Sequence, residues 1–174
     1  FSVGDIYLGR IRKIMPGLNA AFVDIGYEKD AFLHYLDLGP QFLSLVKYMK
    51  AVTDQKQPDS LLTNFPMEAD IDKGGKMSSV ISSNQWLAVQ VAKEPISTKG
   101  PRITCDISLA GRYVVMVPFS NVVSVSQKIK SSEERNRLKR LAMSIKPRNF
   151  GLIVRTVAEG KKVAEIDKDI QDLL

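Results

Sequence analysis

The chain has 174 residues, of which 44% are hydrophobic, so it is long enough for one domain or two small ones with a packed core. Its 25 Lys and Arg against 19 Asp and Glu give a net charge of +6, which favours an anionic partner. We expect nucleic acid before a membrane, because no apolar run approaches the roughly 18 residues of a spanning helix. The single cysteine, Cys105, excludes an internal disulfide and a zinc site of paired cysteines, and we expect it to be buried and inert.

The stretch from residue 19 to residue 34 predicts two short strands joined by a tight turn. Because side chains alternate across a strand, Phe22 shares a face with Asp24 and Phe32 shares a face with Asp30, opposite small aliphatic residues. This placement favours a stacking platform for nucleic-acid bases, where each stacked base is worth roughly 1–3 kcal/mol. The alternative is a barrel hairpin whose rings are tucked under a loop.

Three more strands are predicted in the first 110 residues, over 5–15, 85–96 and 102–109. We expect Gly9 to bend the first of them and Tyr7 to share the outer face of the phenylalanines. A loop and an amphipathic helix follow the hairpin, and residues 51–77 then read as a long, partly mobile surface insertion with five acids against three lysines. Five short antiparallel strands with a long linker after the third predict an OB-fold, a five-stranded Greek-key barrel that commonly binds oligonucleotides.

The second part of the chain predicts a small α+β unit, with strands over 112–118, 122–129 and 151–157 and helices over 131–145 and 161–174. Ser131 and Glu134 form the S-x-x-E pattern of a capping box at the start of the first helix. From Lys128 to Arg155 there are nine Lys or Arg and two Glu, a local charge of +7. The last helix has an apolar stripe that nothing in the sequence is left to cover, which favours a further domain: Val163, Ile166, Ile170 and Leu173.

Three segments carry a resemblance to a known family. VGDIYLGRIRKIMPGLNAAFVDIGYEKDAFLH resembles the start of the RNA-binding S1 domain in the ribonuclease E/G family, and KGPRITCDISLAGRYVVMVP and FGLIVRTVAEGK match later parts of the same family. The three cover nearly the whole chain except the insertion. The resemblance implies part of a cytoplasmic endoribonuclease that cuts single-stranded, AU-rich RNA in rRNA maturation and mRNA decay.

The resemblance also implies three regions and their site residues. Residues 1–110 would be the S1 domain of OB-fold type, residues 111–160 a 5′-sensor subdomain, and residues 161–174 a helix leading to a catalytic region that this chain lacks. The residues implied for gripping RNA are Phe22, Phe32 and Lys99. Those implied for sensing a 5′-monophosphate are Gly111, Val115, Arg155 and Thr156. One departure is that Gln127 and Lys128 stand where the family often has two arginines after a serine.

No catalytic or metal-binding residue is expected in this chain. The family hydrolyses RNA with carboxylates that hold Mg²⁺ and shares zinc between subunits through paired cysteines, so the resemblance implies a homo-oligomeric parent protein that uses Mg and zinc. In this chain Asp24, Asp30 and Asp106 are scattered through predicted strands and form no metal pattern. We therefore expect an RNA-binding part that is itself inert.

Two other functions remain open from the sequence. A stand-alone RNA-binding module, on ribosomes or as an RNA chaperone, would have the same barrel without a nuclease partner. An OB-fold that binds carbohydrate is the third possibility, and the net positive charge argues against it.

Overall fold

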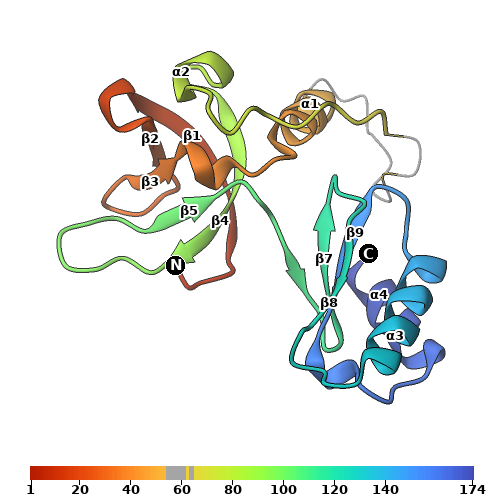
Figure 1. Cartoon of the computed structure of the whole chain (residues 1–174). Helices are drawn as coiled ribbons and strands as arrows, with labels where there is room; N and C mark the ends of the chain where they lie inside the picture. Colours follow the sequence, from red (N-terminus) through yellow and green to blue (C-terminus); the bar gives the residue numbers. More distant parts are fainter. Residues whose placement is uncertain (54–61, 63–64) are drawn as a thin grey trace. The chain divides into compact units, whose positions relative to one another are not determined.

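The chain divides into two compact units, and the computed structural model describes residues 1–53, 62 and 65–174 of them (Figure 1). The barrel unit comprises residues 1–57 and 68–107, and the sheet unit comprises residues 58–67 and 108–174. Ten residues of the expected insertion, 54–61 and 63–64, lie outside the described part of the chain.

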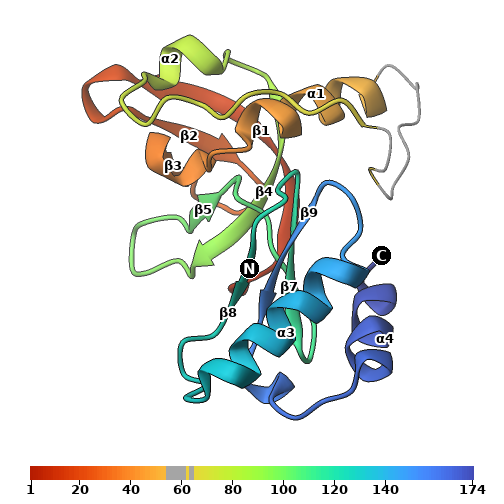
Figure 2. The same cartoon turned by 45° about the vertical axis from the view of Figure 1, so that its right-hand side comes forward.

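Five strands close the barrel in the order β1-β2-β3-β5-β4 (Figure 2). The strands are β1 (Ile6–Met15), β2 (Ala20–Asp24), β3 (Ala31–His34), β4 (Trp86–Lys93) and β5 (Arg102–Thr104). This confirms the OB-fold with one correction, because β3 and β5 meet in parallel at Phe32 and Arg102 whereas all other pairs are antiparallel. The parallel contact arises because β4 lies between these two strands in the sequence and pairs with β5 on its other side.

Alternation fills the barrel core as the sequence predicts, with Ile11, Val23 and Leu33 fully buried. Gly9 lies on the same inner side of β1, where a Cβ would come within 2.7 Å of the Val23 side chain, so glycine lets β1 curve around the core. Tyr7 follows the same period and also points inward. The expectation that Tyr7 lies on the outer face is therefore wrong, and its ring instead stacks on another ring at the barrel end, with 5.0 Å between the centroids of Phe1 and Tyr7.

Short helices connect the barrel strands: η1 (Pro16–Leu18), η2 (Tyr35–Leu38), α1 (Phe42–Thr53) and α2 (Met77–Val80). The residues just before α2 are hydrogen-bonded to the barrel at two points. The Tyr35 hydroxyl donates to the Asp72 carbonyl at 2.5 Å, and the Asn19 side chain binds the Gly75 carbonyl at 3.1 Å. The expectation of a surface insertion is wrong at Leu62, which is 3% exposed within the sheet unit.

Four strands form the sheet of the second unit in the order β6-β7-β9-β8. Its elements are β6 (Leu109–Ala110), β7 (Val114–Pro118), β8 (Val123–Val125), α3 (Ser132–Ile145), β9 (Phe150–Val154), η3 (Thr156–Ala158) and α4 (Val163–Leu173). The predicted strand over 102–109 is wrong, since β5 ends at Thr104 and β6 begins at Leu109 in another sheet. The predicted strand over 122–129 shortens to β8, which runs parallel to β9.

The two long helices cover one face of this sheet (Figure 2). Helix α3 packs on β8 and β9, and α4 packs on β7. Ile166 and Ile170 of α4 are 0% exposed, so the expectation of an uncovered stripe is wrong for these two residues. Val163, at the start of the same helix, is 48% exposed. The stripe therefore supplies core contacts within the sheet unit and gives no evidence of a further domain.

Helix α3 begins with half of the expected capping box. The Ser131 hydroxyl accepts the Glu134 N–H, as the pattern predicts. The Glu134 carboxylate does not return to the cap residue and instead accepts from the Arg137 guanidinium and the Gly160 N–H. These contacts tie the first turn of α3 to the turn before α4.

The same contacts predict a pH-dependent contribution to stability. The Arg137 side chain first, and then the Gly160 N–H, lower the pKa of Glu134 to about 2. A depressed pKa in the folded state means that this stabilisation is present above the unfolded pKa near 4.5 and is lost as the pH falls towards 2. We expect Glu134→Gln to reduce the free energy of unfolding by about 1 kcal/mol at pH 6, because the pair lies near the surface, and by much less near pH 2, where the folded carboxyl is already partly protonated.

Urea denaturation at the two pH values measures this difference. Glu133→Gln removes the same charge one residue earlier and is the matched control. An equal loss for Glu134→Gln at both pH values would contradict the assignment.

Candidate nucleic-acid interface

Two aromatic rings on the outer face of the barrel lie between basic side chains. The strand registers pair Lys13 with Phe22 and Phe22 with Phe32, and Phe32 faces Arg102 across the parallel contact. These four residues therefore form one row over β1, β2, β3 and β5, which we call the aromatic row. The two rings are half-buried and meet edge to face, with centroids 6.0 Å apart. They belong to the outer surface and not to the barrel core, as alternation predicts.

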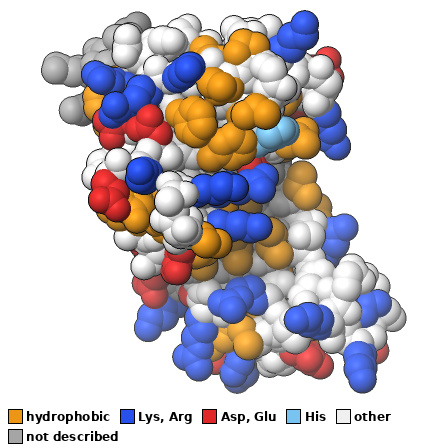
Figure 3. Space-filling view, turned by 90° about the vertical axis from the view of Figure 1, so that its left-hand side faces the viewer, with side chains coloured by type: hydrophobic (Ala, Val, Ile, Leu, Met, Phe, Trp, Pro, Cys, Tyr) orange, Lys and Arg blue, Asp and Glu red, His pale blue; other side chains and the backbone are white. Residues whose placement is uncertain are grey.

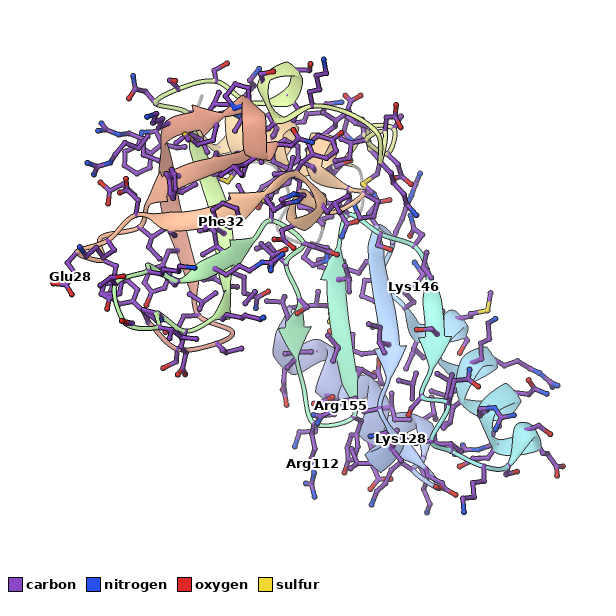
Figure 4. All side chains as sticks on the ribbon, turned by 60° about the vertical axis from the view of Figure 1, so that its left-hand side comes forward. Glu28, Phe32, Arg112, Lys128, Lys146 and Arg155 are labelled. Atoms are coloured by element: carbon purple, nitrogen blue, oxygen red, sulfur yellow. The ribbon has the colours of Figure 1, made fainter. Side chains whose placement is uncertain are left out.

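A cleft of about 680 Å³ opens beside the aromatic row. Phe22 and Phe32 form part of its wall, and Lys99 and Arg102 bring positively charged side chains to it. Phe32 is labelled in Figure 4. The structure thus brings together the three residues proposed for gripping RNA: Phe22, Phe32 and Lys99. Figure 3 shows hydrophobic side chains gathered beside the single histidine, His34, with Lys and Arg side chains close by.

The two acids on the phenylalanine face share one arginine. Arg12 occupies the irregular position between Ile11 and Lys13 in the β1–β2 register. Its guanidinium binds Asp24 at 2.9 Å and Asp30 at 3.2 Å. The Gly26 N–H and the Arg12 guanidinium lower the pKa of Asp24. Arg12 offsets one of these two negative charges, and Lys13 and Lys99 add positive charge beside the rings.

The turn that carries Lys99 lies directly on the hairpin. Lys99 donates its N–H to the Ile96 carbonyl at 3.0 Å, which closes the turn. A Cβ at Gly100 would fall on the backbone carbonyl of Asp30, so only glycine allows this approach. This close contact fixes the Lys99 turn as one wall of the cleft.

Sequence reasoning missed the basic residues of the row. Arg102 lies beside the buried Ile103, so alternation alone could have placed it outward with the phenylalanines. It also binds Asp37 at 3.0 Å, which fixes its guanidinium at the rim. The outward position of Lys13 could be predicted only by knowing of the irregular position at Arg12, because that extra residue reverses the alternation of β1.

A second group of polar residues gathers at one end of the sheet unit. The ends of β8 and β9 and the β6–β7 turn meet there, because β8 runs parallel to β9 and β7 runs antiparallel to it. Figure 4 shows Arg112, Lys128 and Arg155 at this end and Lys146 at the opposite end. We call this the basic sheet end. It contains the loop after β8, where Gln127 and Lys128 follow Ser126.

Arg155 and Thr156 leave β9 at this end, as the proposed phosphate contact requires. β9 stops at Val154, and Arg155 is the cap residue of η3. The Arg155 Nη1 donates to the Gly111 carbonyl at 2.8 Å and approaches the Arg112 carbonyl at 3.4 Å. The Thr156 hydroxyl lies 2.8 Å from the Ser126 hydroxyl. A guanidinium has five N–H donors, so Arg155 can hold these carbonyls and still present donors to a phosphate.

The other two residues proposed for phosphate sensing lie on the β6–β7 hairpin. Gly111 is in the turn and contacts Arg155 directly. Val115 stands one step along β7, opposite Ala110 and Ile153 in the ladder, and its side chain is half-buried. The four residues thus belong to one hairpin and the adjoining strand end.

Asp169 holds this hairpin from α4. Its carboxylate accepts the backbone N–H groups of Arg112, Tyr113 and Val114 at 3.0, 2.8 and 3.1 Å. A Cβ at Gly111 would come within 2.5 Å of the same carboxylate, so glycine makes the close approach possible. Sequence reasoning missed Asp169, because its partners lie more than fifty residues earlier and no local pattern links them.

The described residues also include acids, one cysteine and one histidine, which in other proteins can bind metals or act as nucleophiles. No three His, Cys, Asp or Glu side chains come together as a metal site in residues 1–53, 62 and 65–174. Cys105 is buried, and burial raises the pKa of its thiol. The His34 ring accepts the Leu36 N–H at 3.1 Å and caps η2. None of the helices in these ranges is long and apolar enough to cross a membrane.

Comparison with known proteins assigns the chain to a family. The sequence model of the ribonuclease E/G family matches residues 108–174. Ribonuclease E of Nostoc sp. is 42% identical over 172 residues, covering 98% of this chain and 21% of that protein. Ribonuclease E of Synechocystis sp. is 40% identical over 172 residues, covering 98% of this chain and 22% of that protein. Ribonuclease G of Escherichia coli is 39% identical over 167 residues, covering 96% of this chain and 30% of that protein.

The chain spans about a fifth to a third of the length of these relatives. Within that span the match covers 98% of the chain and therefore extends over both units. The chain belongs to the ribonuclease E/G family.

Proposed function

We propose that the barrel unit grips single-stranded RNA on the aromatic row, as an S1-type domain. The observation that supports this is the placement of Phe22 and Phe32 between Lys13 and Arg102 beside an open cleft. Flat rings stack on the faces of unpaired bases, and basic side chains at both ends of the row attract the backbone phosphates. Stacking of this kind tolerates any base sequence, so the row supplies grip more than sequence discrimination.

Removing either ring tests this proposal. Phe22→Ala or Phe32→Ala is expected to weaken binding of a single-stranded RNA oligomer by about 1–3 kcal/mol, or roughly five- to 150-fold. The folded barrel should persist, because both rings are half-buried on its outer face. Fluorescence anisotropy with a labelled oligomer measures the affinity, and thermal melting measures the stability.

Tyr27→Ala is the matched control. Tyr27 is an aromatic residue of the same hairpin, and its ring stacks on Phe1 outside the cleft. Its removal should leave RNA affinity unchanged. If Phe22→Ala instead kept full affinity and lost roughly 3–5 kcal/mol of stability, as a core residue would, the stacking role would be refuted.

We further propose that the basic sheet end senses the 5′-monophosphate of the RNA. Arg155 would bind the phosphate through its guanidinium, with the Thr156 hydroxyl beside it and the hairpin residues Gly111 and Val115 completing the pocket. Support comes from the fixed position of Arg155 on two carbonyls, which lowers the entropy that a long side chain loses on binding.

For the whole protein we propose an RNase E/G-type endoribonuclease of the cytoplasm, acting in rRNA maturation and mRNA decay. The relatives that bear the names ribonuclease E and ribonuclease G support this proposal. Hydrolysis would depend on Mg²⁺ held by carboxylates, and assembly into a homo-oligomer on zinc, in parts of the protein that this chain does not include. The chain itself would hold the RNA.

A further inference from the structure

Besides the aromatic row, the outer face of the barrel has another aromatic ring with a cation beside it. Trp86 opens β4 and is 52% exposed. It stands opposite Arg10 in the β1–β4 register, and the Arg10 guanidinium carbon lies 6.0 Å from the centroid of the indole ring. At this distance the cation is attracted to the ring face. The exposed face of an indole ring is a surface on which a nucleobase can stack.

The pair adjoins a cleft of about 500 Å³ within the barrel unit. Trp86 forms one wall, and Met49 and Lys50 of α1 contribute to another. Asn84 and Gln85 bring amide groups to the same cleft. A flat ring, an ammonium group and amides at one opening are the groups that bind a nucleobase: the ring stacks, the amides hydrogen-bond to the base edge, and the cation holds a phosphate.

The Trp86 cleft is separated from the Phe22 strand by one strand of the closed barrel, β1. Arg10 pairs with Trp86 on one side and with Asp24 on the other. Asp24 is two residues from Phe22 on the outer face of β2, so the two rows are neighbours. Adjacent strands lie about 4.8 Å apart and alternate residues about 6.6 Å apart, which puts the backbone of Trp86 roughly 12 Å from that of Phe22 along the barrel. The curvature of the closed barrel adds to the distance between the two rings, so the RNA strand would wrap around β1. A single strand of a few nucleotides can cover this distance.

The charges between the two rows favour a polyanion. Arg12 binds both Asp24 and Asp30. Within residues 1–53, 62 and 65–174, no carboxylate forms an ion pair with Arg10, and none forms one with Lys13. Arg10 lies over the Trp86 ring and acts on Asp24 at longer range, and Lys13 adds a second cation of β1 beside Phe22. A protein partner covering an apolar face would not need this line of positive charge.

We propose that Trp86 and Arg10 form a second stacking subsite, which binds an unpaired base of the same RNA strand that occupies the aromatic row. The inference rests on the proposed RNA binding by the barrel. It adds a contact that lengthens the bound segment and raises affinity for longer oligomers. The amides of Asn84 and Gln85 would hold the base against the indole ring, and Lys50 would hold its phosphate.

The chain offers a direct probe, because Trp86 is its only tryptophan. Titration with a ten-nucleotide oligouridylate should quench the intrinsic fluorescence in parallel with the anisotropy of a labelled copy of the oligomer. An abasic oligomer of the same length, which has the phosphates without the bases, should not quench it. Trp86→Ala should weaken binding by about five- to 150-fold, and Trp86→Phe, which keeps a ring, should retain most of the affinity.

The outcomes separate this inference from the proposal on which it rests. If the wild-type chain fails to bind the oligouridylate, the proposed RNA binding itself is refuted. If the chain binds it and Phe22→Ala weakens binding while the Trp86 fluorescence and the affinity of Trp86→Ala stay unchanged, only the second subsite is refuted, and the face is left for a protein partner. Equal quenching by the abasic oligomer would refute stacking. The fluorescence titration uses the wild-type chain, so the test does not depend on a variant that folds.

Discussion

Replacing Arg155 with alanine is expected to abolish a preference for 5′-monophosphorylated over 5′-hydroxyl RNA. A charge-assisted hydrogen bond to phosphate is worth about 1.5–3 kcal/mol, so the wild-type chain should favour the monophosphate by roughly ten- to 150-fold. In Arg155→Ala the two affinities should converge, and the affinity for 5′-hydroxyl RNA should hardly change. Anisotropy titrations with two oligomers that differ only at the 5′ end measure the ratio.

The salt dependence of the two affinities tests the same phosphate contact in a second way. Added salt weakens binding of both oligomers through the shared backbone phosphates, so their ratio should be far less sensitive than either affinity. Arg148→Ala is the matched control, because this exposed arginine precedes β9 at the end of the strand opposite Arg155. If Arg148 contributes to binding, this substitution should weaken the binding of both oligomers equally.

The Arg155 side chain also binds the Gly111 carbonyl, so its removal requires a check of the fold. Thermal melting of the variant distinguishes a lost phosphate contact from an unfolded hairpin. Equal affinities of the wild-type chain for the two oligomers would contradict sensing in this chain. The same equality in the complete protein would contradict the sensing role of Arg155 altogether.

Truncating Ile170 is expected to produce the largest loss of stability among the changes considered. Its side chain is fully buried where α4 packs on β7, and removing a buried isoleucine down to alanine typically costs about 2–5 kcal/mol through lost burial and the cavity left behind. Urea denaturation followed by circular dichroism measures the free energy of unfolding. Because Trp86 is in the barrel unit, its fluorescence in the same samples follows the barrel separately.

Val163→Ala is the control for this measurement. Val163 lies on the same helix and is largely exposed, so its truncation should change stability by no more than about 0.5 kcal/mol. A small effect of Ile170→Ala, comparable to that of Val163→Ala, would show that α4 does not pack on the sheet as described.

The barrel could be predicted from the sequence because its signals are local. Alternation assigns the faces of β2 and β3 correctly, and it places Phe22 and Phe32 outside the core. The prediction failed where an added residue in a strand, or a partner distant in the sequence, determines the face on which a side chain lies. Arg12 shifts the register of β1, and Tyr7 follows the inner period of Gly9 and Ile11, which a reading of the aromatic residues alone does not reveal.

Local sequence patterns also could not predict which partner a side chain binds when several are within reach. Glu134 satisfies the S-x-x-E pattern, yet its carboxylate binds Arg137 and Gly160, because a guanidinium and a loop N–H compete with the cap. Alternation singled out Phe22 and Phe32, and the other candidate site residues came from the resemblance to the family. Trp86 and Arg10 form a pair only through the β1–β4 register, so the sequence gives no direct sign of their contact.

The carboxylate of Asp169 on the β6–β7 hairpin has a consequence for the order in which the chain folds. During synthesis the hairpin leaves the ribosome more than fifty residues before Asp169, so its turn exists for a time without the acceptor for three backbone N–H groups. Contacts of such sequence separation form late, since the chain must first lose the entropy of closing a long loop. Nascent chains that stop short of α4 should therefore present Arg155 on an unfinished turn, and phosphate recognition should mature only when α4 docks.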